Sequence, residues 1–264
     1  MSFLDAITPV ILTYNEEANI ARVLARLTWA RDIVVVDSFS TDATLAMVRS
    51  AGNARLFQRR FDTHAGQWNF SITETGIGSA WILALDADYV LSDAFVEELR
   101  NLQPDAACQA YQADFVYCVL GRPLRGSLYP RGTVLFKRGS AHYVQAGHTQ
   151  RLVAEGTVCL LKSRLLHDDR KSLARWFASQ RMYARLEAEH LLAMPRDRLR
   201  RTDRIRLLGW AAPLLVFFYT LLVRGCILDG WAGWHYVLQR TLAEILIALE
   251  LLDRRLRKHA NTPV

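Results

Sequence analysis

The stretch that decides the fold runs over residues 33–43 and reads IVVVDSFSTDA. Its first four residues are an unbroken aliphatic run, which is typical of a strand buried on both faces of a parallel sheet. The run ends directly in Asp37 and Ser38, and Asp42 is a suitable N-cap for a following helix. A buried strand that ends in polar residues and leads into a helix indicates one unit of an α/β protein.

The same alternation continues on both sides of this stretch. Residues 7–12 are predicted as the first strand and residues 16–27 as a helix with its apolar residues on one face. Further along, residues 55–58 and 81–85 are predicted strands, and residues 92–102 form a helix with Ser92 as N-cap. The repeated strand–helix pattern predicts a mainly parallel sheet flanked by helices.

From residue 106 to residue 166 the pattern changes to short β-type segments separated by glycine and proline turns. Residues 172–192 then form a long amphipathic helix that ends at Met194-Pro195. We therefore expect one catalytic domain over residues 1–192, followed by a basic linker and a helical hairpin over residues 193–264.

Composition excludes several classes of protein. The chain has 264 residues, of which 51% are hydrophobic and 22% charged, so it is not disordered or collagen-like. The net charge of +7 is carried mainly by arginine, which indicates an acidic partner. The cysteines Cys108, Cys118, Cys159 and Cys226 contain no C-x-x-C pair. They predict neither a zinc site nor a disulfide framework, and together with an N-terminus without an export signal they favour a reducing cytosolic setting.

The C-terminal part is strongly apolar over residues 207–228. Residues 207–223 are shorter than the roughly 20 residues of a spanning helix, and Arg224 interrupts the run. The helix predicted after it, over residues 236–257, carries Arg240, Glu244 and Glu250, which do not suit hydrocarbon. We expect an interfacial hairpin on an anionic membrane surface, with packing against the catalytic domain or in a homodimer as the alternative. Nucleic acid is not an expected partner, because the arginine cluster lacks a reading helix or an aromatic platform.

Asp86 and Asp88 form a D-x-D pair directly after a predicted buried strand. Two carboxylates on one short turn can share a divalent cation, although Asp88 as a simple turn cap is the alternative. Asp37 ends another strand of the same sheet, and the carboxyl ends of parallel strands are where open α/β sheets bind ligands. The sequence therefore predicts a ligand site at this edge.

Polar residues also follow the first strand, where Thr13, Asn15 and Glu16 open a helix. Free N–H groups at such a helix start can face a ligand, while capping by Asn15 is the alternative. No G-x-G-x-x-G or P-loop pattern is present, so a dinucleotide fingerprint is excluded.

Five segments together resemble one known family: residues 13–19, 34–43, 67–70 (QWNF), 85–88 (LDAD) and 228–233. The chain resembles family 2 glycosyltransferases of the GT-A type, and more narrowly their lipopolysaccharide-core beta-glucosyltransferase branch. The resemblance implies a Rossmann-like mixed α/β sheet flanked by helices, here with C-terminal membrane-associated helices. It also implies transfer of a sugar, with inversion, from a nucleotide donor to a hydroxyl.

The resemblance assigns roles to particular residues. The metal, Mg²⁺ or Mn²⁺, would be held by Asp86 and Asp88, and His167 matches a histidine that completes such sites; a structural hydrogen bond is its alternative. A metal ion there would stabilise the charge of the departing diphosphate. UDP is the expected nucleotide. The residues expected to contact the nucleotide sugar are Thr13, Asn15, Glu16, Asp37, Ser38, Gln67, Asn69 and Asp86; Arg59 and Arg60 are weaker candidates, since a solvated pair is equally compatible with their positions.

The catalytic base is where the sequence departs from the family. An inverting transferase needs a base within reach of the attacking hydroxyl. The branch commonly has Glu after the histidine that matches His148, but here Thr149 follows. His148, Asp168 or another carboxylate is therefore the candidate base, and a weak or inactive enzyme is the alternative.

These observations predict a hexosyltransferase, with glucose as the expected sugar, at the cytoplasmic side of the inner membrane. Its acceptor is expected to be a lipid-linked or lipopolysaccharide-type glycan. A polyprenyl-phosphate sugar synthase is the alternative enzyme, and a catalytically silent membrane-bound scaffold is the alternative from another class.

Overall fold

The computed structural model describes residues 2–146 and 149–260, which divide into two units. The first unit comprises the chain up to Pro123 together with Tyr129–Lys171. The second comprises Leu124–Leu128 and the chain from Ser172 onward. The division thus falls before the helix that follows Ser172, whereas the predicted domain boundary lies after it, at residue 192.

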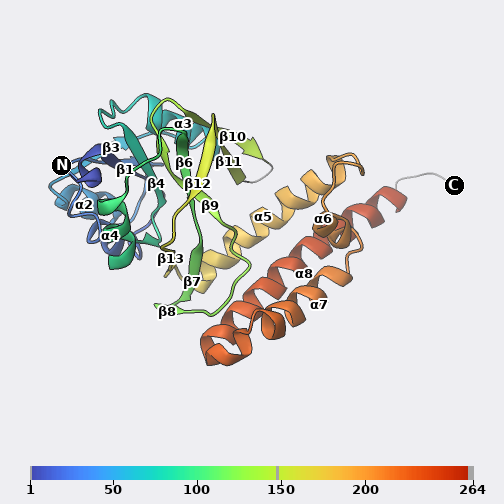
Figure 1. Ribbon diagram of the computed structural model, residues 1–264. Helices are drawn as coiled ribbons and strands as arrows, with labels where there is room; N and C mark the ends of the chain where they lie inside the picture. The colour runs from blue at the N-terminus through green and yellow to red at the C-terminus, as the bar shows by residue number, and fades with distance from the viewer. Residues whose placement is uncertain (1, 147–148, 261–264) are drawn as a thin grey trace. The chain divides into compact units, whose positions relative to one another are not determined.

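The first unit is built on a mixed seven-stranded sheet (Figure 1). Its strands are β1 (Ile7–Thr13), β2 (Ile33–Asp37), β3 (Ala54–Gln58), β4 (Trp81–Asp86), β6 (Cys108–Ala113), β9 (Gly132–Lys137) and β12 (Thr157–Leu160). Their order is β12-β6-β9-β4-β1-β2-β3. The strands β1 to β4 are mutually parallel, and β9 runs antiparallel to both β4 and β6. The predicted α/β class with a mixed sheet is confirmed.

Both faces of this sheet are covered, because successive strand residues point to opposite sides. On one face Ile11 and Leu83 belong to a cluster that includes Val23 and Phe95 of two helices. On the other face Val10, Val36 and Ile82 cluster with Trp68. The helices of this unit are η1 (Phe3–Ala6), α1 (Ile20–Leu24), α2 (Thr44–Ser50), α3 (His64–Thr73) and α4 (Asp93–Asn101).

Strand register places polar residues at one edge. Thr13 lies beside Asp37, and Leu12 lies beside Asp86. The ends of β1, β2 and β4 therefore meet at one edge of the sheet, as the polar residues in the sequence predict.

Two smaller sheets complete the unit. The strands β5 (Tyr89–Val90), β7 (Phe115–Val119), β8 (Arg122–Pro123) and β13 (Leu165–His167) form one in the order β5-β13-β7-β8. β10 (Ala141–Ala146) and β11 (Thr149–Ala154) form an antiparallel pair. β6 and β7 follow each other in the chain but belong to different sheets, and Asp114 between them forms an ion pair with Arg131.

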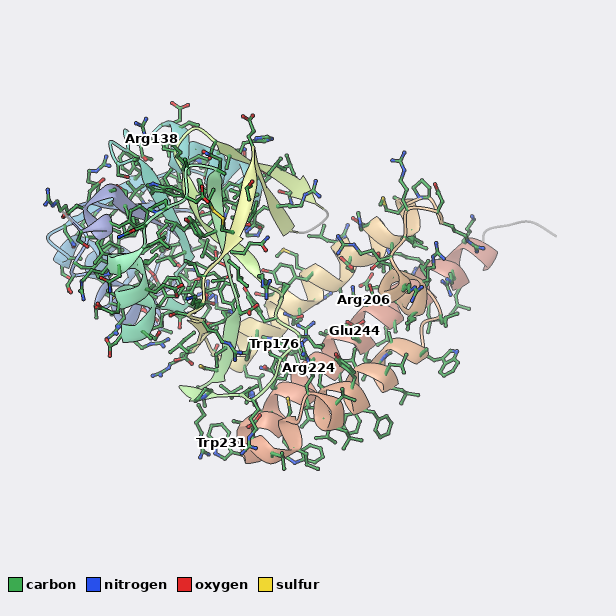
Figure 2. The ribbon with its side chains drawn as sticks, viewed as in Figure 1. Arg138, Trp176, Arg206, Arg224, Trp231 and Glu244 are labelled. Atoms are coloured by element: carbon green, nitrogen blue, oxygen red, sulfur yellow. A yellow bond between two sulfur atoms is a disulfide. The ribbon has the colours of Figure 1, made fainter. Side chains whose placement is uncertain are left out.

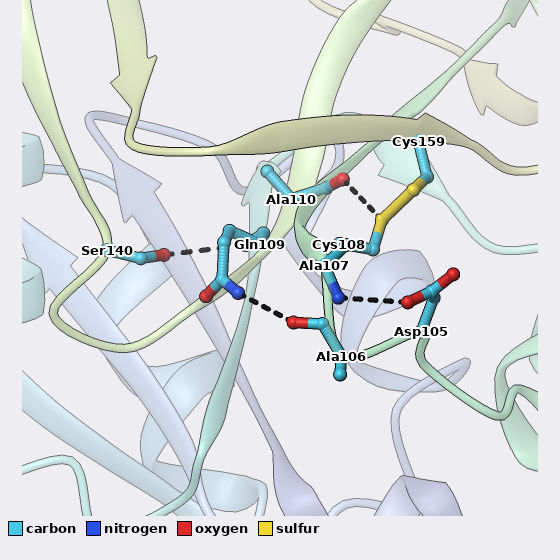
Figure 3. The surroundings of a disulfide bond; sticks show 8 residues. All are labelled: Asp105, Ala106, Ala107, Cys108, Gln109, Ala110, Ser140 and Cys159. Atoms are coloured by element: carbon cyan, nitrogen blue, oxygen red, sulfur yellow. Dashed lines mark hydrogen bonds between the residues drawn. A yellow bond between two sulfur atoms is a disulfide. The ribbon is translucent and has the colours of Figure 1, made fainter.

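A disulfide joins Cys108 of β6 to Cys159 of β12 (Figure 3). This corrects the prediction that the cysteines form no disulfide, which rested on the lack of a C-x-x-C pair. The two residues are 51 positions apart and meet only because β12 adds to the sheet beside β6. Cys118 and Cys226 are free and buried.

The second unit is helical. Its elements are α5 (Leu173–Ala193), α6 (Arg201–Arg206), α7 (Ala211–Phe218), the π-helix η2 (Tyr219–Val223), η3 (Cys226–Asp229) and α8 (Gly230–Ala260). The predicted helix after Ser172 is confirmed, and the Ser172 side chain caps it by accepting a hydrogen bond from the backbone N–H of Arg175. α8 begins at Gly230, ahead of the predicted start at Tyr236.

Charged residues lie inside this helical unit. The guanidinium of Arg206 contacts Glu244 at 2.6 Å and Glu187 at 3.0 Å, which ties α6 to α8 and α5 (Figure 2). Glu244 is 3% exposed. Burial removes water from the Glu244 carboxylate, which is unfavourable. The ion pair with Arg206 compensates for this loss of hydration.

The outer surface of the second unit carries many apolar side chains. Trp210 is 72% exposed and Val223 71% exposed. Along the described chain, no single helix has both the length and the hydropathy of a membrane span. Ala211–Val223 and Cys226–Lys258 meet those two criteria only as a pair, with a bend of 66° between them.

Candidate active site

Asp37 organises the edge of the sheet where β1 and β2 end. Thr13 donates a hydrogen bond from Oγ1 to Asp37 Oδ2 at 2.9 Å, and the backbone N–H of Ser40 donates to Oδ1 at 2.7 Å. The Ser40 hydroxyl also donates to Oδ2, at 2.5 Å. Asp37 is completely buried, so all these bonds replace lost water. Asp37 thereby fixes the two loops that follow β1 and β2.

The loop after β1 is held against the loop after β2 by Asn15 and Glu16. Asn15 has a positive φ of 54°, and its Oδ1 accepts a hydrogen bond from the backbone N–H of Thr41 at 2.7 Å. The backbone N–H groups of Asn15 and Glu16 donate to Ser40 and Thr44 at 2.7 and 2.6 Å. The backbone of Glu16 is thus held by the loop after β2, while its side chain faces Asn19 and Lys171.

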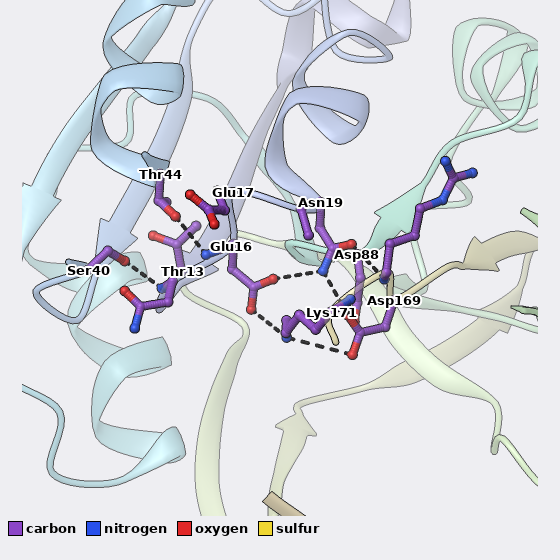
Figure 4. A network of polar contacts seen from close by, with 12 residues as sticks. Thr13, Glu16, Glu17, Asn19, Ser40, Thr44, Asp88, Asp169 and Lys171 are labelled. Atoms are coloured by element: carbon purple, nitrogen blue, oxygen red, sulfur yellow. Dashed lines mark hydrogen bonds and ion pairs between the residues drawn. The ribbon is translucent and has the colours of Figure 1, made fainter. Parts of the chain in front are cut away.

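The carboxylate of Glu16 lies in a polar network with Asn19, Asp169 and Lys171 (Figure 4). Asn19 donates to Glu16 and to Asp169, each at 2.9 Å. Lys171 Nζ lies 2.8 Å from Glu16 Oε1. Burial raises the pKa of Glu16 to about 7, although Lys171 and Asn19 lower it in part.

The D-x-D acids lie at the end of β4, and each has a different partner. Burial, together with the neighbouring charge of Asp88, raises the pKa of Asp86 to about 6, and a hydrogen bond from Tyr89 opposes this rise. Burial also acts to raise the pKa of Asp88, but His167 and Lys171 outweigh it and hold that pKa below its ordinary value. Asp88 Oδ2 lies 3.3 Å from His167 Nε2. The pKa of Asp86 is therefore raised and that of Asp88 is lowered, although the two residues are only two positions apart in the sequence.

The chemistry of these side chains fits a divalent cation. Asp88 Oδ1 and His167 Nδ1 are buried, and neither has a hydrogen-bond partner among the residues that the structure describes. Carboxylate oxygens with an imidazole are ligands that Mg²⁺ and Mn²⁺ accept. Within the described ranges, however, no three His, Cys, Asp or Glu side chains are already arranged around one point as metal ligands. In this structure His167 is the partner of Asp88, so its role as a metal ligand stays a prediction.

A cavity of about 380 Å³ opens beside Asp86. The hydroxyls of Tyr89 and Tyr129 lie 2.5 Å apart, and Trp68 stacks on Tyr143 with ring centroids 5.1 Å apart. All four rings line this cavity. Aromatic walls with a few polar groups are typical of small-ligand sites, and their area suits the apolar faces of a sugar ring.

Gln67 and Asn69, predicted as phosphate donors, are used within the protein. Gln67 donates to the Ser38 hydroxyl at 2.7 Å and accepts from Arg59 at the same distance. Asn69 exchanges two hydrogen bonds with the backbone of Tyr143, at 2.9 and 2.8 Å. Gln67 thus stays near the loop after β2, whereas Asn69 holds β10 against α3. Their contacts to a phosphate stay predictions.

Of the two candidate bases, His148 and Asp168, only Asp168 lies within the described residues. Asp168 Oδ2 is bound by Arg22 at 2.5 Å and by Arg170 at 2.8 Å, and Oδ1 accepts the backbone N–H of Gly121 at 2.9 Å. Both oxygens are therefore engaged in holding the loop after β13, which does not favour proton abstraction. His148 lies outside the described residues.

Several residues of the site were not found from the sequence. Lys171, Asn19 and Asp169 join the Glu16 network, and Tyr89 and Tyr129 line the cavity. Tyr89 directly follows the D-x-D pair, which is a local signal. Lys171 and Tyr129 approach the site only through the path of the folded chain, so no motif marks them.

The acidic residues, including the D-x-D pair, lie at the carboxyl ends of parallel strands, where open α/β sheets bind ligands. Residues 8–150, more than half of the chain, match the family described as Glycosyl transferase family 2. The chain belongs to this family, whose members use nucleotide-sugar donors.

Individual relatives match the chain over a shorter segment than the family does. An uncharacterized glycosyltransferase of Rickettsia felis is 35% identical over 100 residues, covering 38% of this chain and 34% of the relative. The lipopolysaccharide core biosynthesis glycosyltransferase LpsC of Rhizobium meliloti is 34% identical over 99 residues, covering 36% and 34%. The chain spans about a third of the length of these relatives.

Two solved structures are similar to the chain at low identity. Residues 1–349 of S. aureus TarS, in complex with UDP-GlcNAc, give a TM-score of 0.48 at 11% identity, covering 95% of this chain and 92% of that one. Glucosyl-3-phosphoglycerate synthase of Mycobacterium tuberculosis, in complex with Mn²⁺, UDP and glucosyl-3-phosphoglycerate, gives 0.34 at 21% identity, covering 43% and 44%.

Proposed function

We propose that this protein is an inverting hexosyltransferase that moves a sugar, with glucose as the expected one, from a UDP-type donor to a hydroxyl of a glycan. The observation that carries the proposal is the meeting of three strand ends, marked by Thr13, Asp37 and Asp86, in a chain of glycosyltransferase family 2. In this proposal the nucleotide lies beside the D-x-D pair and the sugar lies in the cavity lined by Asp86, and the position of ligand sites at the carboxyl ends of parallel strands supports it.

In this proposal different residues bind different parts of the nucleotide-sugar donor. The rigid loops around Asp37 and Asn15 bind the nucleoside, and Ser38 is held in place by Gln67. Asp86 and Asp88, with His167, hold the divalent metal, which supplies a Lewis acid for the departing diphosphate. The cavity beside Asp86 binds the sugar.

The base is proposed to be His148 rather than Asp168. A general base must have a free acceptor within hydrogen-bond reach of the attacking hydroxyl. Both carboxylate oxygens of Asp168 are occupied by Arg22, Arg170 and Gly121. A His148→Ala variant that keeps the full transfer rate would remove His148 as well.

The acceptor is proposed to be a lipopolysaccharide-core or other lipid-linked glycan. Similarity to LpsC, a lipopolysaccharide core biosynthesis glycosyltransferase, supports this over part of the chain. Exposed apolar side chains of the second unit, such as Trp210 and Val223, support residence on a membrane surface. The proposed location is the cytoplasmic side of the inner membrane, although the Cys108–Cys159 disulfide is of a kind that is rare in reducing compartments.

The test is calorimetric titration of UDP-glucose, UDP-galactose and GDP-mannose into the purified protein, with and without Mn²⁺. Metal-dependent binding of one donor to the wild type, lost in Asp88→Ala, is the expected result. The exposed Asp253, which is ion-paired with Arg257 in the second unit, offers a control, and Asp253→Ala should bind as the wild type does. Failure of all three donors to bind would contradict the proposal.

A further inference from the structure

Lys171 lies at the centre of the polar network described above, although no sequence motif marks it (Figure 4). Its Nζ is 2.8 Å from Glu16 Oε1 and 3.8 Å from Asp169 Oδ2. Only the first distance is short enough for a hydrogen bond. Because an ammonium group has three N–H donors, Lys171 keeps donors for a ligand while it is paired with Glu16.

The backbone that carries Lys171 is fixed in place. The backbone N–H of Lys171 donates to Asp169 Oδ1 at 3.0 Å, and that of Arg170 donates to Asn19 Oδ1 at 2.9 Å. Asn19 is 1% exposed and also binds Glu16. The start of the Lys171 side chain is therefore anchored, while its long aliphatic part allows the ammonium to adjust its position.

The positive charge of Lys171 lowers the pKa values of three carboxylates at this edge of the sheet, those of Glu16, Asp86 and Asp88. It lowers the pKa of Glu16, whose burial acts in the opposite direction, and it contributes in the same way at Asp86 and Asp88. Arg22 and Arg170 are both bound to Asp168, and Arg131 and Arg151 line the cavity beside Asp86. Lys171 is the cation that pairs with Glu16.

A nucleoside diphosphate brings further negative charge to this edge. Glu16 belongs to the proposed nucleoside site and Asp88 to the proposed metal site, so the two phosphates would lie between groups that repel them. One divalent ion offsets only part of this repulsion. The Lys171 ammonium, which lies beside Glu16 and whose charge also acts on Asp88, would compensate the rest, because charge-assisted hydrogen bonds to phosphate oxygens are strong.

We propose that Lys171 binds the diphosphate of the nucleotide donor with the N–H donors that its contact with Glu16 does not use. The inference rests on the proposed function and adds a binding residue for the leaving group. Before the donor binds, Lys171 neutralises Glu16. After it binds, the same charge faces the diphosphate that departs during sugar transfer.

The experiment compares uridine, UMP and UDP as ligands of the wild type, Lys171→Met and Lys171→Arg, by titration calorimetry with and without Mn²⁺. In Lys171→Met the affinity for UDP should fall about 10- to 100-fold and that for uridine by much less, because loss of the Glu16 pair affects both ligands whereas loss of phosphate contacts affects UDP alone. Lys171→Arg keeps the charge and should recover most of the UDP affinity. Lys162→Met, the same change at an exposed lysine of the same unit, is the matched control and should bind UDP normally.

Two results would overturn the inference. Equal losses for uridine and UDP would mean that Lys171 only supports Glu16, and unchanged UDP binding in Lys171→Met would mean that it does not contact the phosphates. A wild type that binds neither UDP nor any UDP-sugar would instead contradict the proposed function itself. Thermal unfolding of each variant distinguishes lost binding from lost folding.

Discussion

Asp168 and Arg22 form a close ion pair in which the guanidinium Nη1 lies 2.5 Å from the carboxylate Oδ2. The side chain of Asp168 is 6% exposed and that of Arg22 26% exposed. Arg22 extends from α1, whereas Asp168 follows β13, so the pair connects segments far apart in the sequence. This relationship makes Asp168 a structural anchor of the loop that carries Lys171.

The first prediction is that Asp168→Ala destabilises the protein. Removal of the carboxylate leaves Arg22 partly buried without its partner, so the free energy of unfolding should fall by about 3 kcal/mol. Urea unfolding measures this change. Asp114→Ala, which removes an exposed ion pair with Arg131, is the control and should cost less than about 1 kcal/mol. An Asp168→Ala variant of wild-type stability but without transfer activity would favour the base role instead.

The second prediction concerns Glu16, whose pKa is raised to about 7, chiefly by burial. Since the folded state holds this proton more tightly than the unfolded state, the contribution of Glu16 to stability is full below about pH 4.5. It is lost as the pH rises through about 7. Glu16→Gln mimics the protonated form, so its stability relative to the wild type should increase between pH 5 and pH 8, by about 3 kcal/mol at most.

Thermal unfolding of both proteins across this pH range measures the difference. Glu17→Gln is the matched control, because Glu17 is the exposed neighbour of Glu16. Its unfolding curve should stay parallel to that of the wild type. Parallel curves for Glu16→Gln as well would show that the protonation of Glu16 is not linked to folding.

The polar edge could be predicted from sequence because its signals are local. The run before Asp37 and the run before Asp86 each mark a buried strand that ends in an acid, and parallel pairing then brings the ends together. The interactions of Glu16 could not be predicted this way. Its partner Lys171 is far along the chain, and its position depends on how β13 joins the small sheet.

The difference between local sequence signals and contacts made only in the folded chain also explains why the disulfide was not predicted. Spacing patterns reveal cysteines that are neighbours in sequence, whereas Cys108 and Cys159 are neighbours only through the pairing of β6 with β12. Gln67 and Asn69 show a related limit. Their residue types suit phosphate binding, but the folded chain supplies nearer partners in Ser38 and the backbone of Tyr143.

The third prediction tests the disulfide. Protein purified without reductant and unfolded in denaturant should show two reactive thiols, those of Cys118 and Cys226, and four after reduction. Cys108→Ser should lower the free energy of unfolding by up to about 4 kcal/mol, the loop-entropy value for a span of this length. Cys226→Ser is the control for loss of a buried thiol. Four reactive thiols without reductant would contradict the pairing and support the reducing setting expected from sequence.

The fourth prediction concerns the membrane surface of the second unit. Trp210→Glu and Val223→Glu place a charge on strongly exposed apolar positions, so each should reduce the fraction of protein bound to anionic vesicles. Neither side chain is part of the buried cluster of this unit, so folding should be retained. Flotation with vesicles of phosphatidylglycerol and phosphatidylcholine measures the bound fraction.

The matched control is Leu160→Glu, which adds the same charge at an exposed leucine of β12 in the first unit. If the apolar surface of the second unit inserts into the lipid, Leu160→Glu should float with the vesicles as the wild type does. Binding that responds equally to all three changes would indicate a general effect of added negative charge. Raising the salt concentration separates the two contributions further, because it weakens attraction of the basic residues 196–206 to lipid head groups but not the insertion of Trp210.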